Sequence, residues 1–299
     1  MNKIETNAAY DHKARVMAEK SASDVRKQGL DKFYTLPNIS NACIQKIGSK
    51  YDWAKWDIVV EPSAGNGSFL QQIPTSKRIG LDIAPEHKDV VKKDFFQYSP
   101  PPGLTNILIV GNPPFGRVSS LAVKFFNHAA QWASVIAFIV PKTFRRISLQ
   151  NRLDTKFHLM YDTDIPSTPC SFHPKMNVKC CFQIWEAKST PRTIQILQTT
   201  HADWEFLSNG PLDSNKQPTP PKHADFAILA YGSDCGKIAQ TDLETLRPKS
   251  WHWIKANIPI ETLIQRFQSL DYSLSKDTAR QNSIGKGELV KLYATAFPV

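Results

Sequence analysis

The chain has 299 residues, which is enough to bury one large hydrophobic core or two modest ones. Its 41% of hydrophobic and 21% of charged residues are typical of a soluble globular protein. A formal net charge of +10 and a pI of about 9.3 favour an anionic partner, nucleic acid first, although the same charge could simply aid solubility.

The cysteines argue against a zinc site and against a disulfide framework. Their number, five, is odd, and no pair has the Cys-x-x-Cys spacing. Cys180 and Cys181 are adjacent, so they should point to opposite faces of a strand. We therefore expect no bound metal and a reducing compartment. The other cysteines are Cys43, Cys170 and Cys235.

The sequence carries no membrane signal. Residues 1–20 are polar and mixed in charge, and no run of 18 apolar residues occurs anywhere. We therefore expect a soluble protein of the cytoplasm or nucleus, with no membrane partner. Residues 1–30 are expected to form a charged, partly helical lead-in.

The next segment, Phe-Tyr-Thr-Leu-Pro at residues 33–37, has two interpretations. Thr35 or Asn38 could cap a helix over residues 39–47, with Pro37 near its first turn. Alternatively, the aromatic ring and the hydroxyl groups could form a lip over a bound cofactor. This stretch alone favours the plain surface helix.

A strand over residues 56–61 leads into a glycine-containing turn. Gly65 and Gly67 would let the backbone approach a ligand closely, and a helix is expected to begin near Phe69. A strand, a glycine turn and a helix form the opening of a nucleotide-binding α/β domain. The third glycine of the dinucleotide fingerprint is missing.

Two further strands end in carboxylates. The strand over residues 78–82 ends at Asp82, where an acidic residue would suit the hydroxyl groups of a ribose. A third strand over residues 90–95 brings Asp94 and Phe95 to its tip, suited to the amino group and the face of an adenine. As an alternative, both aspartates could only cap helices.

The strand over residues 107–111 is apolar enough to be buried on both faces, and it stops at Asn-Pro-Pro-Phe. Prolines lack an N–H and cannot continue a sheet ladder, so a rigid polar turn follows. The amide oxygen of Asn112, the carbonyl of Pro113 and the ring of Phe115 could grip a flat molecule that carries an NH2 group. An ordinary turn from strand to loop would look the same.

A helix over residues 121–132 and a buried strand over residues 135–140 come next. Three basic residues follow that strand and either contact phosphates or begin a solvated helix. They are Lys142, Arg145 and Arg146.

Strands over residues 157–161 and 178–185 are expected to close the sheet, and Phe172 should be an exposed ring in the proline-rich loop between them. Residues 207–224 are expected to be a linker or a long surface loop, and residues 225–299 are expected to form a small α+β region. The tryptophans at 251 and 253 suit sheet core slightly better than base stacking.

The order of these motifs resembles the class I S-adenosylmethionine-dependent methyltransferases of the amino-methylating branch. The upstream Tyr-Thr segment is similar to that of adenine-N6 DNA methyltransferases with an N-terminal cofactor motif. The family implies a Rossmann-like α/β fold over residues 31–206, with a seven-stranded, mostly parallel sheet and helices on both faces. Phe115 departs from the Tyr or Trp common in the DNA enzymes, and Asn-Pro-Pro-Phe also occurs in RNA methyltransferases.

The resemblance assigns roles by position. The catalytic turn is Asn112, Pro113, Pro114 and Phe115. The expected S-adenosylmethionine contacts are Tyr34, Thr35, Pro37, Glu61, Pro62, Ser63, Ala64, Gly65, Gly67, Phe69, Asp82, Ile83, Asp94, Phe95 and Asn112. The expected substrate contacts are Phe115, Phe172, Lys142, Arg145 and Arg146.

The implied function is methyl transfer to the N6 amine of adenine in DNA or RNA. Three alternatives stay open for the acceptor: guanine N2, cytosine N4 and a protein glutamine. A non-catalytic subunit that keeps the fold is another reading, and residues 225–299 could be a target-recognition region.

Overall fold

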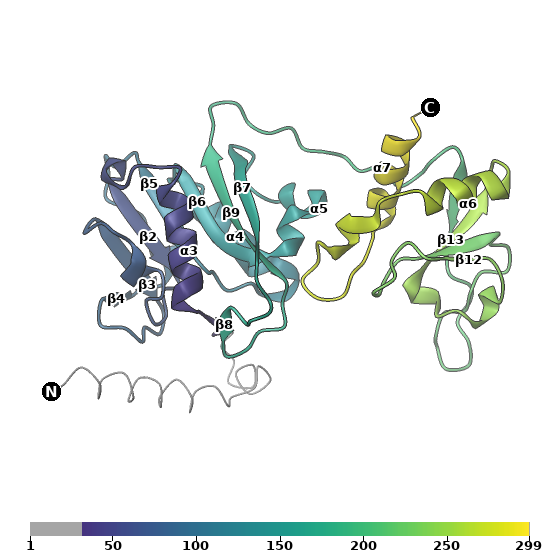
Figure 1. The fold of residues 1–299 in the computed structure, drawn as a ribbon, viewed down its shortest axis with the longest axis horizontal. Helices are drawn as coiled ribbons and strands as arrows, with labels where there is room; N and C mark the ends of the chain where they lie inside the picture. The colour runs from purple at the N-terminus through teal and green to yellow at the C-terminus, as the bar shows by residue number, and fades with distance from the viewer. Residues whose placement is uncertain (1–31, 299) are drawn as a thin grey trace. The chain divides into compact units, whose positions relative to one another are not determined.

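The computed structural model describes residues 32–298 of the chain. The chain divides into two compact units, one up to Ile194 and the other from Gln195 onward (Figure 1). The lead-in expected at residues 1–30 lies outside the described residues. No helix within residues 32–298 is long and apolar enough to cross a bilayer.

Unit 1 is built on a seven-stranded sheet in the order β4-β3-β2-β5-β6-β9-β7. Only β9 runs antiparallel to its neighbours β6 and β7, and the other pairings in the sheet are parallel. This arrangement confirms the predicted Rossmann-like, mostly parallel sheet. Its strands are β2 (Ile58–Pro62), β3 (Arg78–Asp82), β4 (Val90–Lys92), β5 (Ile107–Gly111), β6 (Val135–Pro141), β7 (Phe157–Ile165) and β9 (Cys180–Ala187).

Strands β5 and β6 carry no polar side chain because both of their faces are buried. In β5, Ile107 and Ile109 belong to one hydrophobic core, whereas Leu108 and Val110 belong to a second core on the opposite face. Alternation along a strand produces this division. The adjacent cysteines of β9 follow the same rule, and Cys180 and Cys181 face different cores as predicted.

Helices cover both faces of the sheet, as Figure 1 shows for α3 (Pro37–Gly48) and α4 (Ser120–Ala129). Helix α3 contributes Cys43, Ile44 and Ile47 to one core, at the spacing of a single helical face. Helix α4 supplies the other core. Leu36 stands at the N-cap of α3 without a side-chain cap, so neither Thr35 nor Asn38 caps the helix. The short helix α5 (Ile147–Gln150) follows β6.

The helix expected after β2 does not form. Only the short 3-10 helix η2 (Leu70–Gln72) follows the glycine turn. Pro74 explains this, because proline lacks an N–H and its ring clashes with the preceding turn of a helix. The other 3-10 helices are η1 (Trp53–Lys55), η3 (Phe95–Gln97), η4 (Arg117–Ser119), η5 (Lys142–Arg145), η6 (Leu243–Thr245), η7 (Pro248–Ser250) and η8 (Tyr272–Lys276).

Strand order reverses beside β2, which lies between β3 and β5. The chain first adds β3 and β4 on one side and then returns to add β5 and β6 on the other. Open α/β sheets bind ligands in the crevice at the carboxyl ends of strands where the order reverses. The ends of β2, β3 and β5 are therefore the first place to look for a site. A two-stranded ribbon of β1 (Tyr34–Thr35) and β8 (Phe172–His173) is also present in unit 1.

Unit 2 contains an antiparallel sheet in the order β10-β13-β11-β12. Trp204, Phe226 and Ile254 form its core together with apolar residues of two helices. The strands are β10 (Trp204–Leu207), β11 (Phe226–Leu229), β12 (Ile238–Ala239) and β13 (Trp251–Ala256), and the helices are α6 (Ile260–Gln268) and α7 (Lys286–Ala296).

The predicted boundaries need correction here. The division falls after Ile194 and not at residue 206, because β10 pairs with β13 of the second sheet. Of the two interpretations given for residues 207–224, the structure agrees with the loop: the segment lies within unit 2, and Asn209 Oδ1 accepts a hydrogen bond from Trp253 Nε1 at 3.0 Å. Trp253 is buried, as the sheet-core interpretation predicted.

Candidate active site at the carboxyl edge of the sheet

Asn112 follows β5 directly and holds an open hydrogen-bond acceptor. Its Nδ2 donates to the carbonyl of Phe33 at 3.2 Å, whereas its Oδ1 is buried and has no partner within residues 32–298. Reversing the amide would bring two acceptor oxygens together, so the contact with Phe33 fixes the orientation. A buried acceptor without a partner costs about 1–3 kcal/mol, which points to a ligand that donates here.

The turn that carries Asn112 is rigid. Pro113 is buried and Pro114 is half-buried, and each has a fixed φ. Phe115 packs against both hydrophobic cores of unit 1. Its carbonyl accepts from the backbone N–H of Leu121 at 3.1 Å and of Ala122 at 3.3 Å. The turn therefore connects the end of β5 firmly to the start of α4.

The loop after β2 curls tightly and bonds to the end of β3. Ser63, Gly65 and Gly67 have φ values of 56°, 50° and 76°, in the left-handed region. The N–H of Gly65 donates to Asp82 Oδ2 at 2.8 Å, and the N–H of Ala84 donates to Asp82 Oδ1 at 2.8 Å. Each carboxylate oxygen retains a second lone pair, so Asp82 can still accept from two hydroxyl groups. Asp82 does not cap a helix.

Glu61 supports the same loop from beneath. Its side chain is 2% exposed, and Oε2 accepts from the N–H of Leu70 at 2.6 Å. Burial raises the pKa of Glu61 to about 8, against the opposing effect of backbone hydrogen bonds from Leu70 and Phe69. Gly111 of the neighbouring strand leaves room for it, because a Cβ there would lie 3.3 Å from Glu61 Cγ. Glu61 thus holds the loop in place.

The segment around β1 crosses over these loops. Tyr34 Oη and Lys32 Nζ both donate to Glu86 Oε1, each at 2.7 Å. Glu86 in turn donates its N–H to the carbonyl of Gly65 at 3.0 Å. Burial, followed by the bond to Glu86, raises the pKa of Tyr34 well above its ordinary value. Thr35 Oγ1 is a second buried oxygen without a partner within residues 32–298.

Three predicted ring contacts lie elsewhere. Phe172 is 5% exposed and not an exposed ring, because it pairs with Thr35 across the β1–β8 ribbon and packs into the core beneath α3. Phe95 and Phe69 are also core residues, at 3% and 1% exposure. The ring of Phe96, next to Phe95, is the exposed one at 39%.

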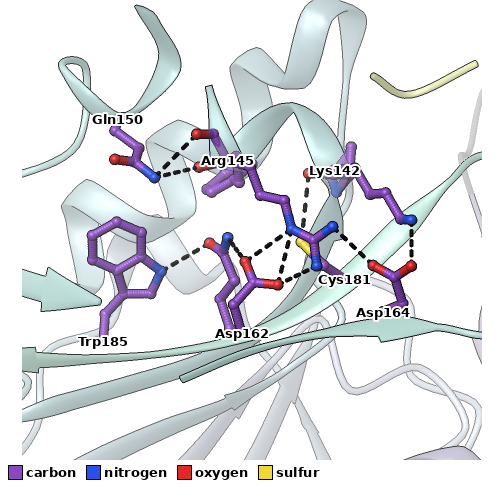
Figure 2. Close-up of polar contacts among 10 residues, drawn as sticks. Lys142, Arg145, Gln150, Asp162, Asp164, Cys181 and Trp185 are labelled. Carbon is purple, nitrogen blue, oxygen red and sulfur yellow. Dashed lines mark hydrogen bonds and ion pairs between the residues drawn. The ribbon is translucent and has the colours of Figure 1, made fainter. Parts of the chain in front are cut away.

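Two of the three basic residues expected to contact phosphates, Lys142 and Arg145, form ion pairs with carboxylates of β7. Figure 2 shows Arg145 between Asp162 and Asp164, with Nη1 2.8 Å from Asp164 Oδ1 and Nε 2.9 Å from Asp162 Oδ1. Lys142 Nζ lies 2.6 Å from Asp164 Oδ2. These ion pairs compete with the phosphate contacts expected of Lys142 and Arg145, which stay a prediction. Arg146 is half-buried at the N-cap of α5.

The cluster around Arg145 continues into the core. Gln183 Nε2 donates to Asp162 Oδ2 at 2.6 Å, and the indole of Trp185 donates to Gln183 Oε1 at 3.0 Å. Gln183 is fully buried. These contacts, partly visible in Figure 2, join β7 and β9 to the end of β6. The cluster therefore reads as structural support for this end of the sheet.

The remaining predicted site residues lie at or just after the ends of β2, β3 and β4, or at the start of α3. Asp94 Oδ1 accepts from the N–H of Phe96 at 2.9 Å and caps η3, and its contact with the amino group of an adenine stays a prediction. Ile83 follows Asp82 and is 57% exposed. Pro37 is the exposed first residue of α3. Pro62 ends β2, and Ala64 packs into the core.

Sequence reasoning missed three participants: Lys32, the Phe33 carbonyl and Glu86. Glu86 meets Lys32 only through tertiary folding, and a carbonyl carries no sequence signal. No local pattern could have singled them out. The residues that the structure does bring together are Tyr34, Gly65, Asp82 and Asn112.

No protein-family model matches the chain, and no curated protein matches it. Among solved structures, it is similar to the 23S rRNA methyltransferase ErmE, at 16% identity over 54% of this chain and 71% of that chain, with a TM-score of 0.38. It is also similar to a candidate RNA methyltransferase from Pyrococcus horikoshii, at 15% identity over 55% and 88%, with a TM-score of 0.41.

A third similar structure is magnesium protoporphyrin IX methyltransferase from Synechocystis PCC 6803 with bound SAM. It is 9% identical over 51% of this chain and 79% of that chain, with a TM-score of 0.38. These are distant likenesses. The function proposed below depends on the residues of this chain and on their geometry.

Proposed function

We propose that unit 1 is an S-adenosylmethionine-dependent methyltransferase that acts on the exocyclic N6 amine of adenine in nucleic acid. The observation that carries this proposal is the buried Oδ1 of Asn112, an acceptor without a partner whose orientation is fixed by Phe33. An exocyclic amine is a donor of the kind that this oxygen lacks.

The residues around the glycine loop fit the cofactor. Asp82 offers two carboxylate oxygens for ribose hydroxyls, and the exposed apolar side chain of Ile83 lies next to it in the sequence, where a purine ring would cover it. Gly65 and Gly67 give the loop its left-handed turns, and the side chains of Tyr34 and His87 pack against them. Thr35 adds a second buried oxygen without a partner. When bound, S-adenosylmethionine supplies a methyl group already activated by its sulfonium.

The chain's own residues then have to position the acceptor. The target amine donates one hydrogen to Asn112 Oδ1 and the other to the carbonyl of Pro113. These two oxygens hold the nitrogen in line and stabilise the positive charge that develops on it during transfer. Phe115 stacks on the base, and its placement between two cores keeps the ring in position. No general base is needed before transfer.

The charge distribution supports a polyanionic substrate for unit 1. Residues 195–299 contain eleven Lys and Arg and eleven Asp and Glu, so the whole formal excess of +10 lies in residues 1–194. A nucleic-acid backbone is attracted by such an excess, and a neutral acceptor gains nothing from it. Unit 2, with no formal net charge, is correspondingly a weaker candidate for the target-recognition role.

Other acceptors with an NH2 group would satisfy Asn112 in the same way. Guanine N2 in RNA, cytosine N4 and the amide of a protein glutamine therefore remain the second candidates. A non-catalytic subunit would not need an open acceptor held in a rigid turn, and this feature favours an enzyme.

The test is methyl transfer from labelled S-adenosylmethionine to separate pools of duplex DNA, single-stranded DNA, RNA and protein. Wild type, Asn112→Ala and the exposed control Asn215→Ala are compared, with nucleoside analysis of the product. We expect N6-methyladenine in a nucleic-acid pool, at least about 100-fold less of it with Asn112→Ala, and no change with Asn215→Ala. Calorimetric titration with S-adenosylmethionine shows whether Asn112→Ala still binds the cofactor, because Asn112 Nδ2 also bonds to the carbonyl of Phe33 in the segment over the glycine loop.

Two results would contradict the proposal. If the labelled methyl group is found in protein or on another base, the acceptor is one of the second candidates and not adenine N6. Equal transfer by Asn112→Ala and wild type would remove Asn112 from the mechanism.

A further inference from the structure

The loop between the Asn-Pro-Pro-Phe turn and α4 has an unusual backbone. Val118 has φ 50° and ψ 42°, and Ser119 has φ 58° and ψ 17°, so two consecutive non-glycine residues are left-handed. A β-branched residue such as valine is a genuine outlier in this region. Strain of this kind persists only where the surrounding structure imposes it, and it clusters at functional positions.

Both ends of the loop are fixed. Ser119 is 4% exposed, and its Oγ lies 2.9 Å from Thr143 Oγ1 of η5. At the other end, Gly116 is packed so tightly that a Cβ there would lie 2.7 Å from Leu121 Cβ. The backbone strain at Val118 and Ser119 therefore cannot be relieved by movement of the whole loop. The surrounding fold sets the loop's conformation.

The tip of the loop points its apolar side chain into solvent. Val118 is 76% exposed, although it lies only three residues after the half-buried Phe115. Arg117 is exposed beside it and forms no ion pair with any residue from 32 to 298. An apolar residue held outward at a backbone cost, next to an available cation, is not explained by packing within unit 1.

We propose that Val118 is a wedge that enters the base stack beside the target nucleotide, while Arg117 contacts a neighbouring phosphate. This inference rests on the proposed function, because Phe115 and Asn112 can grip a base only after it has left its stack. Extruding a stacked base costs a few kcal/mol, and inserted apolar side chains are a common way to fill the space that it leaves. The strained backbone aims Val118 away from the core and toward such a stack.

The deciding variant is Val118→Asn. Asparagine tolerates the left-handed region far better than valine, so this variant keeps or improves the folded loop while it removes the apolar wedge. A merely structural role for Val118 would leave activity unchanged or improved. Leu212→Asn serves as the control, because Leu212 is a 64% exposed apolar loop residue of unit 2.

Transfer is measured on duplex and single-stranded forms of the same sequence, in the polymer that the wild type methylates. With Val118→Asn we expect kcat/KM to fall at least about tenfold on the duplex and less than about threefold on the single strand, where no stack has to be opened. An equal fall on both forms, or no fall on either, overturns the wedge. Arg117→Ala should lower affinity for both forms and reduce the salt slope by about one.

A second measurement does not depend on transfer. Duplex oligonucleotides with 2-aminopurine in place of adenine become fluorescent when the base unstacks. The wild type with S-adenosylmethionine should raise this emission, and Val118→Asn should remove most of the rise. A wild type that binds the duplex without raising the emission overturns the wedge even if transfer occurs. A wild type that raises it but methylates no pool contradicts the proposed function and leaves the wedge supported.

Discussion

The ring of Tyr34 lies directly against Gly65. A Cβ added to Gly65 would meet Tyr34 Cε1 at 2.9 Å, and Gly65 has a φ of 50°. On its other side, Gly65 donates its N–H to Asp82. The glycine loop is thus held between an aromatic ring from the N-terminal segment and a carboxylate at the end of β3. Any side chain at position 65 would have to displace the ring.

Gly65→Ala should therefore destabilise the protein by about 2–4 kcal/mol, through backbone strain and through the clash with Tyr34. Cofactor affinity should fall with it, because the loop moves. Urea unfolding and calorimetric titration with S-adenosylmethionine measure the two effects.

Gly103→Ala is the matched control. Gly103 also has a positive φ, 87°, but a Cβ there would meet no atom within 4 Å. The free energy of unfolding of Gly103→Ala should fall only by the cost of a left-handed backbone at alanine, about 1–2 kcal/mol. Its cofactor affinity should not change. If both variants lose the same stability, the contact between Tyr34 and Gly65 has no energetic importance.

The central sheet could be predicted because its signal is local. Residues 107–111 and 135–140 are continuous apolar runs, and each ends at a proline or a polar turn. Such runs form strands buried on both faces wherever they occur in a parallel sheet. Asn112 could also be placed, since Asn-Pro-Pro must leave the ladder at the strand's carboxyl end.

The features that could not be predicted share a different cause, which is that the deciding partner lies far away in the sequence. Arg145 reads as a free cation until β7 brings Asp162 beside it. Phe172 reads as exposed until β8 pairs with β1. Strand β10 was missed because its partner, β13, follows only after a long loop. Local patterns contain none of these pairings.

Stability should decline with rising pH in a window set by Glu61. Its pKa is about 8 in the folded protein, whereas an unfolded glutamate titrates near 4.5. Between these pH values the unfolded chain releases the proton that the folded protein retains. Raising the pH therefore stabilises the unfolded state relative to the folded state. The free energy of unfolding should fall by up to about 1.4 kcal/mol per pH unit in this range and level off above it.

Glu61→Gln isolates this effect, because glutamine stays neutral and can still accept from Leu70. Urea unfolding of both proteins at several pH values from 5 to 9 should give similar stabilities near pH 5. Near pH 8 the variant should be the more stable one. Parallel profiles would mean that Glu61 is ionised throughout.

Arg145 should matter for stability far more than Lys142. Arg145→Ala leaves Asp162, only 21% exposed, without its cation, and should cost about 2–4 kcal/mol. Lys142→Ala loses one contact to Asp164, which is 58% exposed, and should cost at most about 1 kcal/mol. Thermal unfolding measures both. The salt dependence of nucleic-acid binding should not change in Lys142→Ala, and a clear decrease in its slope would support Lys142 as a substrate contact.

Glu86 should act as a latch for the N-terminal segment over the glycine loop. Its Oε1 accepts from both Lys32 and Tyr34, and its own N–H bonds to Gly65. Partial burial opposes ionisation, but the bonds from Lys32 and Tyr34 hold the pKa of Glu86 below its ordinary value. The contribution of this carboxylate is therefore present at neutral pH and is lost as the pH falls through the folded pKa.

Glu86→Gln removes the charge and keeps the shape. Because the side chain is 41% exposed, we expect a modest effect, a roughly two- to fivefold faster hydrogen exchange at residues 33–36. Exchange in β5 and β6 should not change. Dissociation of S-adenosylmethionine should accelerate by a similar factor, because the segment that crosses the loop opens more often. Asp89→Asn, an exposed acid in the same turn, provides the control. If the two variants exchange alike at residues 33–36, the segment is held by the β1–β8 pairing and by Asn112, and Glu86 is not a latch.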